Sequence, residues 1–158
     1  MNLLLCGVLK QAMNHKQRIE EIVEIKIPSK TKHLHAMRLL TQNLAESMGF
    51  GTKDSEKAAL AVEEALTNVI EHAYHGEEDR KMRVIYEIEN GKLTVRILHQ
   101  GDQFDASQYS STDDLTQFYK QRKKGGLGVL IMKRCMDEVT YKSGPRQNEC
   151  CMIKYLRK

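Results

Sequence analysis

The sequence predicts an α+β domain, a two-layer sandwich in which helices cover one face of a mixed, mostly antiparallel sheet. Strand and helix patterns follow one another in the order strand, helix, helix, strand, strand, helix, strand, strand. Two of the strand patterns flank Asn90-Gly91, which is a strong signal for a two-residue hairpin turn. The 158 residues suit one domain with its own core, and no linker or repeat divides them.

The first two elements are a strand and a helix. Residues 19–27 alternate between apolar and charged side chains, which predicts a strand, and Pro28 favours a place at the edge of the sheet. Ser29 is then placed to cap a helix that runs to about Met48, because leucine and methionine recur along one face of the segment. Gly49 ends this helix.

A second helix and a hairpin follow. The helix begins at Asp54, and its apolar positions recur at i, i+3, i+4 and i+7 as far as Ala73. Residues 82–89 and 93–98 alternate on either side of the Asn-Gly turn and form the predicted hairpin.

The last third of the chain holds a long polar segment and three further elements. Residues 99–126 lack periodicity, and a loop of that length in a compact domain is usually functional or mobile. Residues 127–136 return to a helical pattern. Residues 139–142 and 151–156 are typical of strands, and a Gly-Pro turn separates them.

The composition excludes several classes of protein. Hydrophobic residues make up 41% and charged residues 29%, which excludes a membrane-embedded chain and argues against a disordered one. Aromatic residues make up only 6% with no Trp, so the chain lacks a platform for stacking nucleic acid bases. The net charge of +4 is mild, and we expect neither nucleic acid nor membrane as a partner. The four cysteines form no C-x-x-C motif, and a reducing cytoplasm is the simplest location.

Residues 1–18 are interpreted as an N-terminal extension, expected to be disordered, that precedes a domain over residues 19–158. The short apolar run after Met1 is a poor signal peptide, because no Lys or Arg precedes it and its length is at the lower limit. A natural start at Met13, or a loose extension, explains this segment better.

Three polar side chains of the second helix, Glu64, Asn68 and His72, recur at i, i+4 and i+8 and so share one side of that helix. This side adjoins the apolar stripe, where a polar group needs a partner. On the spacing alone, a solvated face with ordinary ion pairs is the favoured explanation. The alternative is a pocket in which the carboxylate acts as a general base and the carboxamide oxygen binds Mg²⁺.

Two glycine-containing segments carry the remaining signals. Gly101 follows the strand that ends near His99, and glycine there permits a tight turn or the close approach of a ligand; a plain turn explains it equally well. Gly126 and Gly128 open the last helix, where free backbone N–H groups and the helix dipole favour an anion such as phosphate. A solvated basic loop is the alternative, since neither a Walker motif nor a Rossmann fingerprint is present.

The order of these three motifs resembles the Bergerat-type ATP-binding fold of histidine kinases. That fold carries E-x-x-x-N on a helix, a D-x-G-x-G-like turn after a strand, and a flexible lid that ends in G-x-G. Within the family, the chain is most similar to small anti-sigma factors that are also serine-protein kinases. The segments from Glu64 to Tyr74 and from Gly126 to Val139 carry the similarity, which extends over roughly residues 20–156.

The resemblance implies a role for each motif residue. Glu64 would activate a serine hydroxyl of a partner protein, and Asn68 would hold Mg²⁺ at the phosphates of ATP. Lys124 would lie near the terminal phosphates, and glycines of the lid would let its backbone approach them. The other residues implied in the nucleotide site are His72, His99, Gly101, Gly126, Leu127 and Gly128. The implied partners are a sigma factor, an antagonist protein that carries the serine, and a second copy of the chain in a homodimer.

The chain departs from the family pattern where the base is bound. His99 occupies the position of the aspartate that accepts a hydrogen bond from the adenine amino group, and a neutral imidazole has one acceptor nitrogen. Gln103 replaces the second glycine of the turn, and Cys150 falls near the position of a threonine that supports adenine binding. Two hypotheses follow: an ATP-dependent protein-serine kinase, and a non-catalytic module of the same fold that binds and sequesters its partner.

Overall fold

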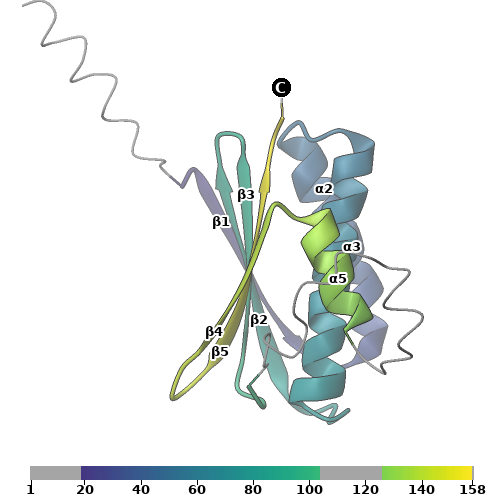
Figure 1. Cartoon of the computed structure of the whole chain (residues 1–158), viewed down its shortest axis with the longest axis vertical. Helices are drawn as coiled ribbons and strands as arrows, with labels where there is room; N and C mark the ends of the chain where they lie inside the picture. The colour runs from purple at the N-terminus through teal and green to yellow at the C-terminus, as the bar shows by residue number, and fades with distance from the viewer. Residues whose placement is uncertain (1–18, 104–125, 158) are drawn as a thin grey trace, which may run out of the picture.

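The computed structural model describes residues 19–103 and 126–157, which form a five-stranded sheet with helices on one face (Figure 1). The strand order is β1-β2-β3-β5-β4. The strands span Glu21–Pro28 (β1), Lys81–Glu89 (β2), Lys92–His99 (β3), Glu138–Ser143 (β4) and Asn148–Tyr155 (β5). The expectation for residues 1–18 lies outside the described part of the chain.

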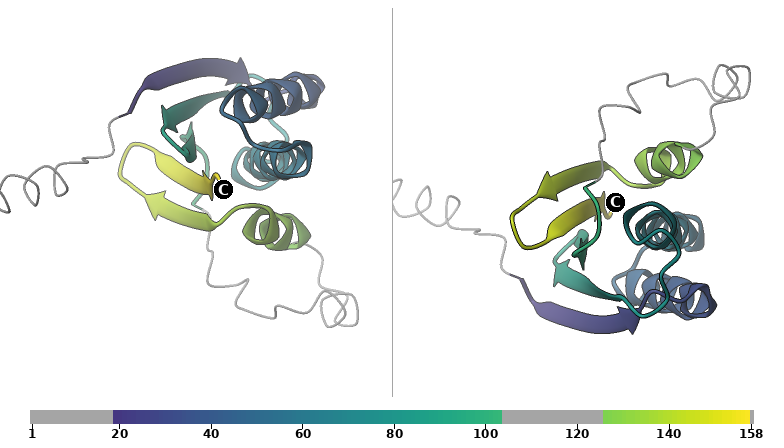
Figure 2. Two further views of the ribbon diagram at one scale, coloured as in Figure 1. Left: turned by 90° about the horizontal axis from the view of Figure 1, so that it is seen from above. Right: turned by 90° about the horizontal axis from the view of Figure 1, so that it is seen from below.

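The helices form the second layer and lie along one face of the sheet in both views of Figure 2. A 3₁₀ turn, η1 at Thr31–His33, leads into α2 at Leu34–Ser47, and α3 covers Thr52–Asn68. A π-helical turn, η2 at Val69–Ala73, continues α3 directly, and α5 covers Leu127–Cys135. The predicted two-layer α+β architecture and the predicted order of elements are confirmed.

Every pairing among the described strands is antiparallel, so the expectation of a mixed sheet is wrong in this respect. The reason is the place of each strand in the sheet. α2 and α3 together return the chain to the end of the sheet where β1 stops, so β2 runs antiparallel to β1. β3 and β4 run in the same direction, but β5 lies between these two strands and is antiparallel to both.

The two N-terminal helices begin differently from the prediction. Ser29 does not cap α2, because its hydroxyl donates to the carbonyl oxygen of Glu77 and the 3₁₀ turn intervenes. α3 begins at Thr52 rather than at Asp54, directly after Gly51 in an extended conformation. The hairpin of β2 and β3 and the edge position of β1 are as predicted.

The core lies between the helix layer and the inner face of the sheet. Alternate residues of β2 and β3 are fully buried there, among them Val84, Tyr86 and Val95. Tyr86 forms a buried hydrogen bond with Thr41 of α2 at 2.8 Å, which pairs these hydroxyls inside the core. No helix in residues 19–103 and 126–157 is long and apolar enough to cross a membrane.

Candidate functional site

A cavity of about 400 Å³, open to solvent on one side, lies between the helix layer and one end of the sheet. Its walls come from α3, η2, the end of β3, α5, β4 and β5, and the residues that form them are Ala65, Asn68, Val69, His72, Ala73, His99, Asp102, Gln103, Met132, Tyr141 and Cys150. The buried members are Ala65, Val69, His99, Met132 and Cys150. The cavity therefore has an apolar floor with one imidazole in it.

Glu64 and Asn68 meet the first turn of α5 at one end of this cavity. A Cβ atom added to Gly128 would lie 2.8 Å from Oε2 of Glu64 and 3.2 Å from Oδ1 of Asn68. Glycine therefore lets the backbone of α5 come this close to the two polar side chains. Gly126, the N-cap of α5, has a φ of 94°, which glycine adopts readily. The carboxylate, the carboxamide and the helix N-terminus that the sequence singled out are thus together in space.

The carboxylate of Glu64 lies in a half-buried position. Burial raises the pKa of its carboxyl group, and the charges of Glu63 and Glu71 raise it further. Glu63 is held by Arg38 at 2.7 Å, whereas Glu64 has no ion pair among the described residues. A carboxylate in this setting binds a proton more readily than an exposed one, which suits a general base.

Asn68 has an unsatisfied amide. Its Nδ2 atom is buried and has no hydrogen-bond partner among the described residues, although buried polar groups are normally paired. A ligand oxygen in the cavity would supply that partner. The Oδ1 atom is an acceptor of the kind that Mg²⁺ takes, and the described residues contain no group of three or more His, Cys, Asp or Glu that could hold a metal. The site therefore fits Mg²⁺ held by one protein oxygen together with phosphate and water.

The π-helical turn η2 changes the arrangement of the polar residues that follow Asn68. Its five residues wind more widely than an α-helix, so His72 does not repeat the direction of Asn68 as an ordinary i+4 residue would. His72 still borders the cavity, at its exposed rim. The carbonyl oxygen of Ala73, at the end of η2, accepts a hydrogen bond from the backbone N–H of Asp102 at 2.9 Å.

His99 ends β3 and lies at the floor of the cavity, where it is 5% exposed. Its Nδ1 atom accepts a hydrogen bond from the backbone N–H of Gly101 at 3.3 Å. Burial lowers the pKa of the imidazole, so the ring is neutral at physiological pH and carries its proton on Nε2. The ring of Tyr74 meets the imidazole edge-on, with 5.9 Å between the ring centroids.

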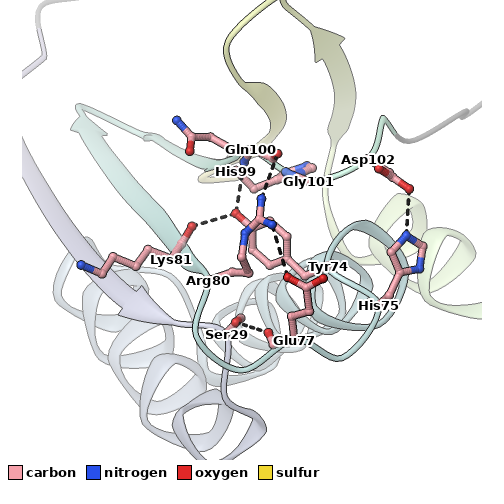
Figure 3. A network of polar contacts seen from close by, with 10 residues as sticks. All are labelled: Ser29, Tyr74, His75, Glu77, Arg80, Lys81, His99, Gln100, Gly101 and Asp102. Atoms are coloured by element: carbon pink, nitrogen blue, oxygen red, sulfur yellow. Dashed lines mark hydrogen bonds and ion pairs between the residues drawn. The ribbon is translucent and has the colours of Figure 1, made fainter.

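Tyr74 holds the end of β3 against the helix layer (Figure 3). Its hydroxyl donates to the carbonyl oxygen of Lys81 at 2.7 Å and accepts from the backbone N–H of Gln100 at 3.1 Å. The guanidinium of Arg80 lies over its ring, 4.9 Å from the centroid. Because Tyr74 is buried, these contacts fix the strand end that carries His99.

The turn after β3 is fastened to the same helix end. A Cβ atom on Gly101 would clash with the carbonyl oxygen of Ala73 and lie 2.6 Å from Cδ1 of Tyr74, so the position requires glycine. The carboxylate of Asp102 pairs with Nε2 of His75 at 2.8 Å, a contact also drawn in Figure 3. The turn is therefore held against the end of η2 by a backbone hydrogen bond, by the packing of Gly101 and by the pair of Asp102 with His75.

β4 and β5 close the other side of the cavity. Nδ2 of Asn148 donates to the carbonyl oxygen of Gly101 at 2.8 Å and supports the turn from β5. Burial raises the pKa of the Cys150 thiol to about 12, so the thiol stays protonated and unreactive at neutral pH. Tyr141 is opposite Cys150 in the strand register, and its hydroxyl donates to Sδ of Met132 at 4.0 Å.

Most of the predicted site residues lie at or beside the cavity. Those that border it or meet at its end are Glu64, Asn68, His72, His99 and Gly128. Gly101 supports the turn beneath His99, and Gly126 caps α5. Leu127 lies in the first turn of α5 without lining the cavity, and Lys124 lies outside the described residues.

Four residues that shape this region were not predicted as site residues: Tyr74, Asp102, Met132 and Tyr141. Alternation along β4 and the helical spacing of α5 could have placed Tyr141 and Met132 on the inner side. For Asp102, no local pattern indicates a contact with His75, because the two lie 27 residues apart.

Comparison with protein families and curated proteins gives consistent results. A model of the family described as the histidine kinase-like ATPase domain matches residues 27–154. The chain is 33% identical to the serine-protein kinase RsbW of Bacillus velezensis over 141 residues, which cover 86% of each chain. It is 30% identical to the serine-protein kinase RsbW of Staphylococcus aureus over 151 residues, or 90% of this chain and 91% of the relative.

Two solved structures share the fold at low sequence identity. A chain in the crystal structure of the SiaB–SiaC complex from Pseudomonas aeruginosa superposes with a TM-score of 0.63 and 14% identity, over 95% of this chain and 98% of that one. A Mycobacterium tuberculosis chain with RsbU and RsbW domains gives a TM-score of 0.60 and 12% identity. That match covers 86% of the present chain, which spans only 32% of the longer one.

Proposed function

Because the chain belongs to the histidine kinase-like ATPase domain family, we propose that it is an ATP-dependent protein-serine kinase, which transfers the terminal phosphate of ATP to a serine of a partner protein. The observation that carries this proposal is the meeting of Glu64, Asn68 and Gly128 at the end of an apolar cavity. The curated relatives that match most of the chain are named serine-protein kinases, which supports the same reaction.

The geometry supports one orientation of the nucleotide. The phosphates lie toward Gly126 and Gly128, because the free N–H groups in the first turn of α5 and the helix dipole attract anions there. The base lies toward Met132 and His99, because that end of the cavity is buried and mostly apolar. Asn68 borders the cavity and also contacts the Gly128 position, so it stands between the two ends.

Asn68 is the proposed protein ligand of Mg²⁺, through its Oδ1 atom. Mg²⁺, when bound with ATP, neutralises charge on the phosphates. The Nδ2 atom of the same carboxamide then donates to the nucleotide, which removes the unsatisfied buried donor. This arrangement uses both halves of the carboxamide.

Glu64 is the proposed general base. The hydroxyl oxygen of the partner's serine forms a bond to the terminal phosphorus of ATP, and the bond from that phosphorus to the bridging oxygen breaks, which releases ADP. The hydroxyl proton passes to a carboxylate oxygen of Glu64. The raised pKa of Glu64 improves its match to this proton transfer.

The proposal includes the regulatory role that the sequence resemblance implies. The chain binds a sigma factor and phosphorylates the serine of an antagonist protein, as a homodimer in the cytoplasm. His72, Gly101, Leu127 and Lys124 are proposed as further nucleotide contacts. A non-catalytic, partner-binding module of the same fold is the second candidate, and the buried imidazole of His99 at the base end of the cavity favours it.

Transfer of labelled phosphate from ATP to the serine of the antagonist protein tests the kinase proposal. Glu64→Gln should lower the transfer rate by about 10²- to 10⁴-fold, the usual contribution of a general base. Glu63→Gln is the matched control, because this neighbouring carboxylate is occupied by Arg38 and should keep most of the rate. Full transfer by Glu64→Gln would remove Glu64 from this role, and a native chain that binds ATP without transfer would favour the second candidate.

Calorimetric titration with ATP, with and without Mg²⁺, tests the metal ligand. Mg²⁺ should strengthen ATP binding by the native chain, and Asn68→Ala should lose about tenfold or more of that gain, because it removes a contact to a charged group. Asn43→Ala, on the exposed side of α2, is the control and should behave like the native chain. An undiminished Mg²⁺ effect in Asn68→Ala would contradict the assignment.

A further inference from the structure

We propose that His99 presents a hydrogen-bond donor, not an acceptor, to the nucleotide base, so that the site binds a 6-oxopurine nucleotide at least as well as a 6-aminopurine one. This inference rests on the proposed nucleotide site and names its base preference. It follows from three observations: the tautomer of the imidazole, the position of the ring in the cavity, and the surroundings of the ring.

The tautomer is set by the turn that follows His99. The backbone N–H of Gly101 donates to Nδ1, so this nitrogen must be the one without a proton. The other nitrogen, Nε2, then carries the hydrogen of the neutral ring. The packing of Gly101 against Ala73 and Tyr74 holds the turn in place, so this N–H stays aimed at Nδ1.

The ring lies where a base would meet it. His99 borders the cavity while it is 5% exposed, and Tyr74 packs edge-on against the imidazole (Figure 3 shows the neighbourhood). No described residue is hydrogen-bonded to Nε2. Nε2 is therefore the nitrogen left for a ligand.

The described surroundings of the ring offer few acceptors in place of a carboxylate. Gln103 and Asp102 line the cavity at its exposed rim, and the hydroxyl of Tyr141 donates to Sδ of Met132. The other buried side chains that line this end, Val69, Met132 and Cys150, carry no oxygen or nitrogen in their side chains. The carboxylate that borders the cavity belongs to Asp102, whose side chain is 74% exposed and paired with His75. Because solvent screens a carboxylate that is this exposed, Asp102 is a weak partner for a base at the buried floor of the cavity.

The chemistry at C6 of a purine then decides the preference. Adenine presents an amino donor at C6 beside the acceptor N1, whereas hypoxanthine presents an acceptor, O6, beside N1–H. A carboxylate would select the amino group and repel O6. The Nε2–H group of His99 can pair with O6, or with N1 of adenine, and gives the amino group no partner.

Titration of the full-length chain with ATP and with inosine triphosphate in the presence of Mg²⁺ tests this inference, since the two ligands differ only in the groups at C6 and N1. The native chain should bind inosine triphosphate as tightly as ATP or more tightly. His99→Asp should shift the ratio of the two dissociation constants toward ATP by about tenfold or more, the usual effect of a charged hydrogen bond. His35→Asp makes the same change on the exposed face of α2 and should leave the ratio unchanged.

A native chain that binds ATP more tightly than inosine triphosphate would overturn the inference and leave the proposed kinase intact. An unchanged ratio in a folded His99→Asp variant would overturn it too. If the native chain bound neither nucleotide, both the proposed function and this inference would fail. His99→Asn, which offers a neutral acceptor, replaces His99→Asp if thermal melting shows that the buried aspartate prevents folding, and it should shift the ratio in the same direction.

Discussion

Glu64 and Asn68 show how a helix places costly polar groups beside a core. Each directly precedes a buried apolar residue, Ala65 and Val69, so neither side chain can turn fully to solvent. Partial burial raises the pKa of the Glu64 carboxyl group. The buried Nδ2 atom of Asn68 has no hydrogen-bond partner among the described residues. Buried polar groups without partners are expected at binding sites, because a bound ligand can supply the missing contacts.

The raised pKa of Glu64 predicts a gain in stability when its charge is removed. A group whose pKa is higher in the folded chain contributes stability below its unfolded-state pKa and loses it as the pH rises through the folded-state pKa. At neutral pH the partly desolvated carboxylate of Glu64 therefore lowers the free energy of unfolding of the native chain. Glu64→Gln should raise the free energy of unfolding by up to about 1 kcal/mol, because solvent screens part of that effect.

Urea denaturation at neutral pH and at about pH 4, near the ordinary pKa of glutamate, measures this effect. The gain from Glu64→Gln should shrink at the lower pH, where the native carboxyl group is already protonated. Glu63→Gln should show no gain, because it loses the ion pair with Arg38. Equal stability of native chain and Glu64→Gln at neutral pH would contradict the prediction.

At the scale of elements, η2 and the turn after β3 behave as one unit. Gly101 packs on the backbone of Ala73, and the backbone N–H of Asp102 donates to the carbonyl oxygen of Ala73. The hydroxyl of Tyr74 forms hydrogen bonds with the backbones of Lys81 and Gln100. The strand end that carries His99 is therefore positioned by the π-helical turn. A shift in either segment moves the floor of the cavity.

Gly101→Ala should disrupt this unit. The added methyl group would meet the backbone oxygen of Ala73, which cannot swing aside as the end of a flexible side chain can, so the free energy of unfolding should fall by about 2–4 kcal/mol. The matched variant Gly51→Ala lies at a residue with a φ of -65° and no atom within 4 Å of the new methyl group, and should cost less than about 1 kcal/mol. Chemical denaturation compares the two, and equal losses would refute the predicted coupling.

At the scale of the whole molecule, one buried lysine joins the two layers. Nζ of Lys154 in β5 donates to the carbonyl oxygen of Cys135 at the end of α5, at 2.8 Å. It also lies 3.5 Å from Oδ1 of Asp54 in the first turn of α3. A cation at the C-terminal end of one helix and an anion at the N-terminal end of another both suit the helix dipoles. Lys154 thus connects the sheet to the two helices that enclose the Glu64 and Gly128 contact.

Lys154→Ala should lower the free energy of unfolding by about 2–4 kcal/mol, because it leaves a cavity and an unpaired carbonyl oxygen. Hydrogen exchange of the backbone amides of α5 should quicken in the same variant. Lys142→Ala, on the exposed strand β4, is the control and should change stability by less than about 0.5 kcal/mol. A loss for Lys154→Ala no larger than that of the control would show that the buried ammonium does not hold the layers together.

Much of the fold and part of the site could be predicted because they depend on residues close together in the chain. The hairpin at Asn90-Gly91 and helix α3 were predicted from local patterns, and both predictions are confirmed. Glu64 and Asn68 were found in the same way, since one helix carries both. The prediction failed at Ser29, whose hydroxyl binds a carbonyl group 48 residues away instead of the nearest helix end.

The order and type of the elements, and the carboxylate and carboxamide of α3, follow from local sequence patterns, because hydrogen bonds within helices and hairpins join near neighbours and leave a periodic signal. The antiparallel pairing of every described strand, the support of the turn by Tyr74 and the tautomer of His99 required the folded arrangement. These features depend on where β5 inserts and on contacts such as that between Tyr74 and Gln100, 26 residues apart. Such contacts form only when the whole chain packs, because they join residues that are far apart and leave no pattern in a short stretch of sequence.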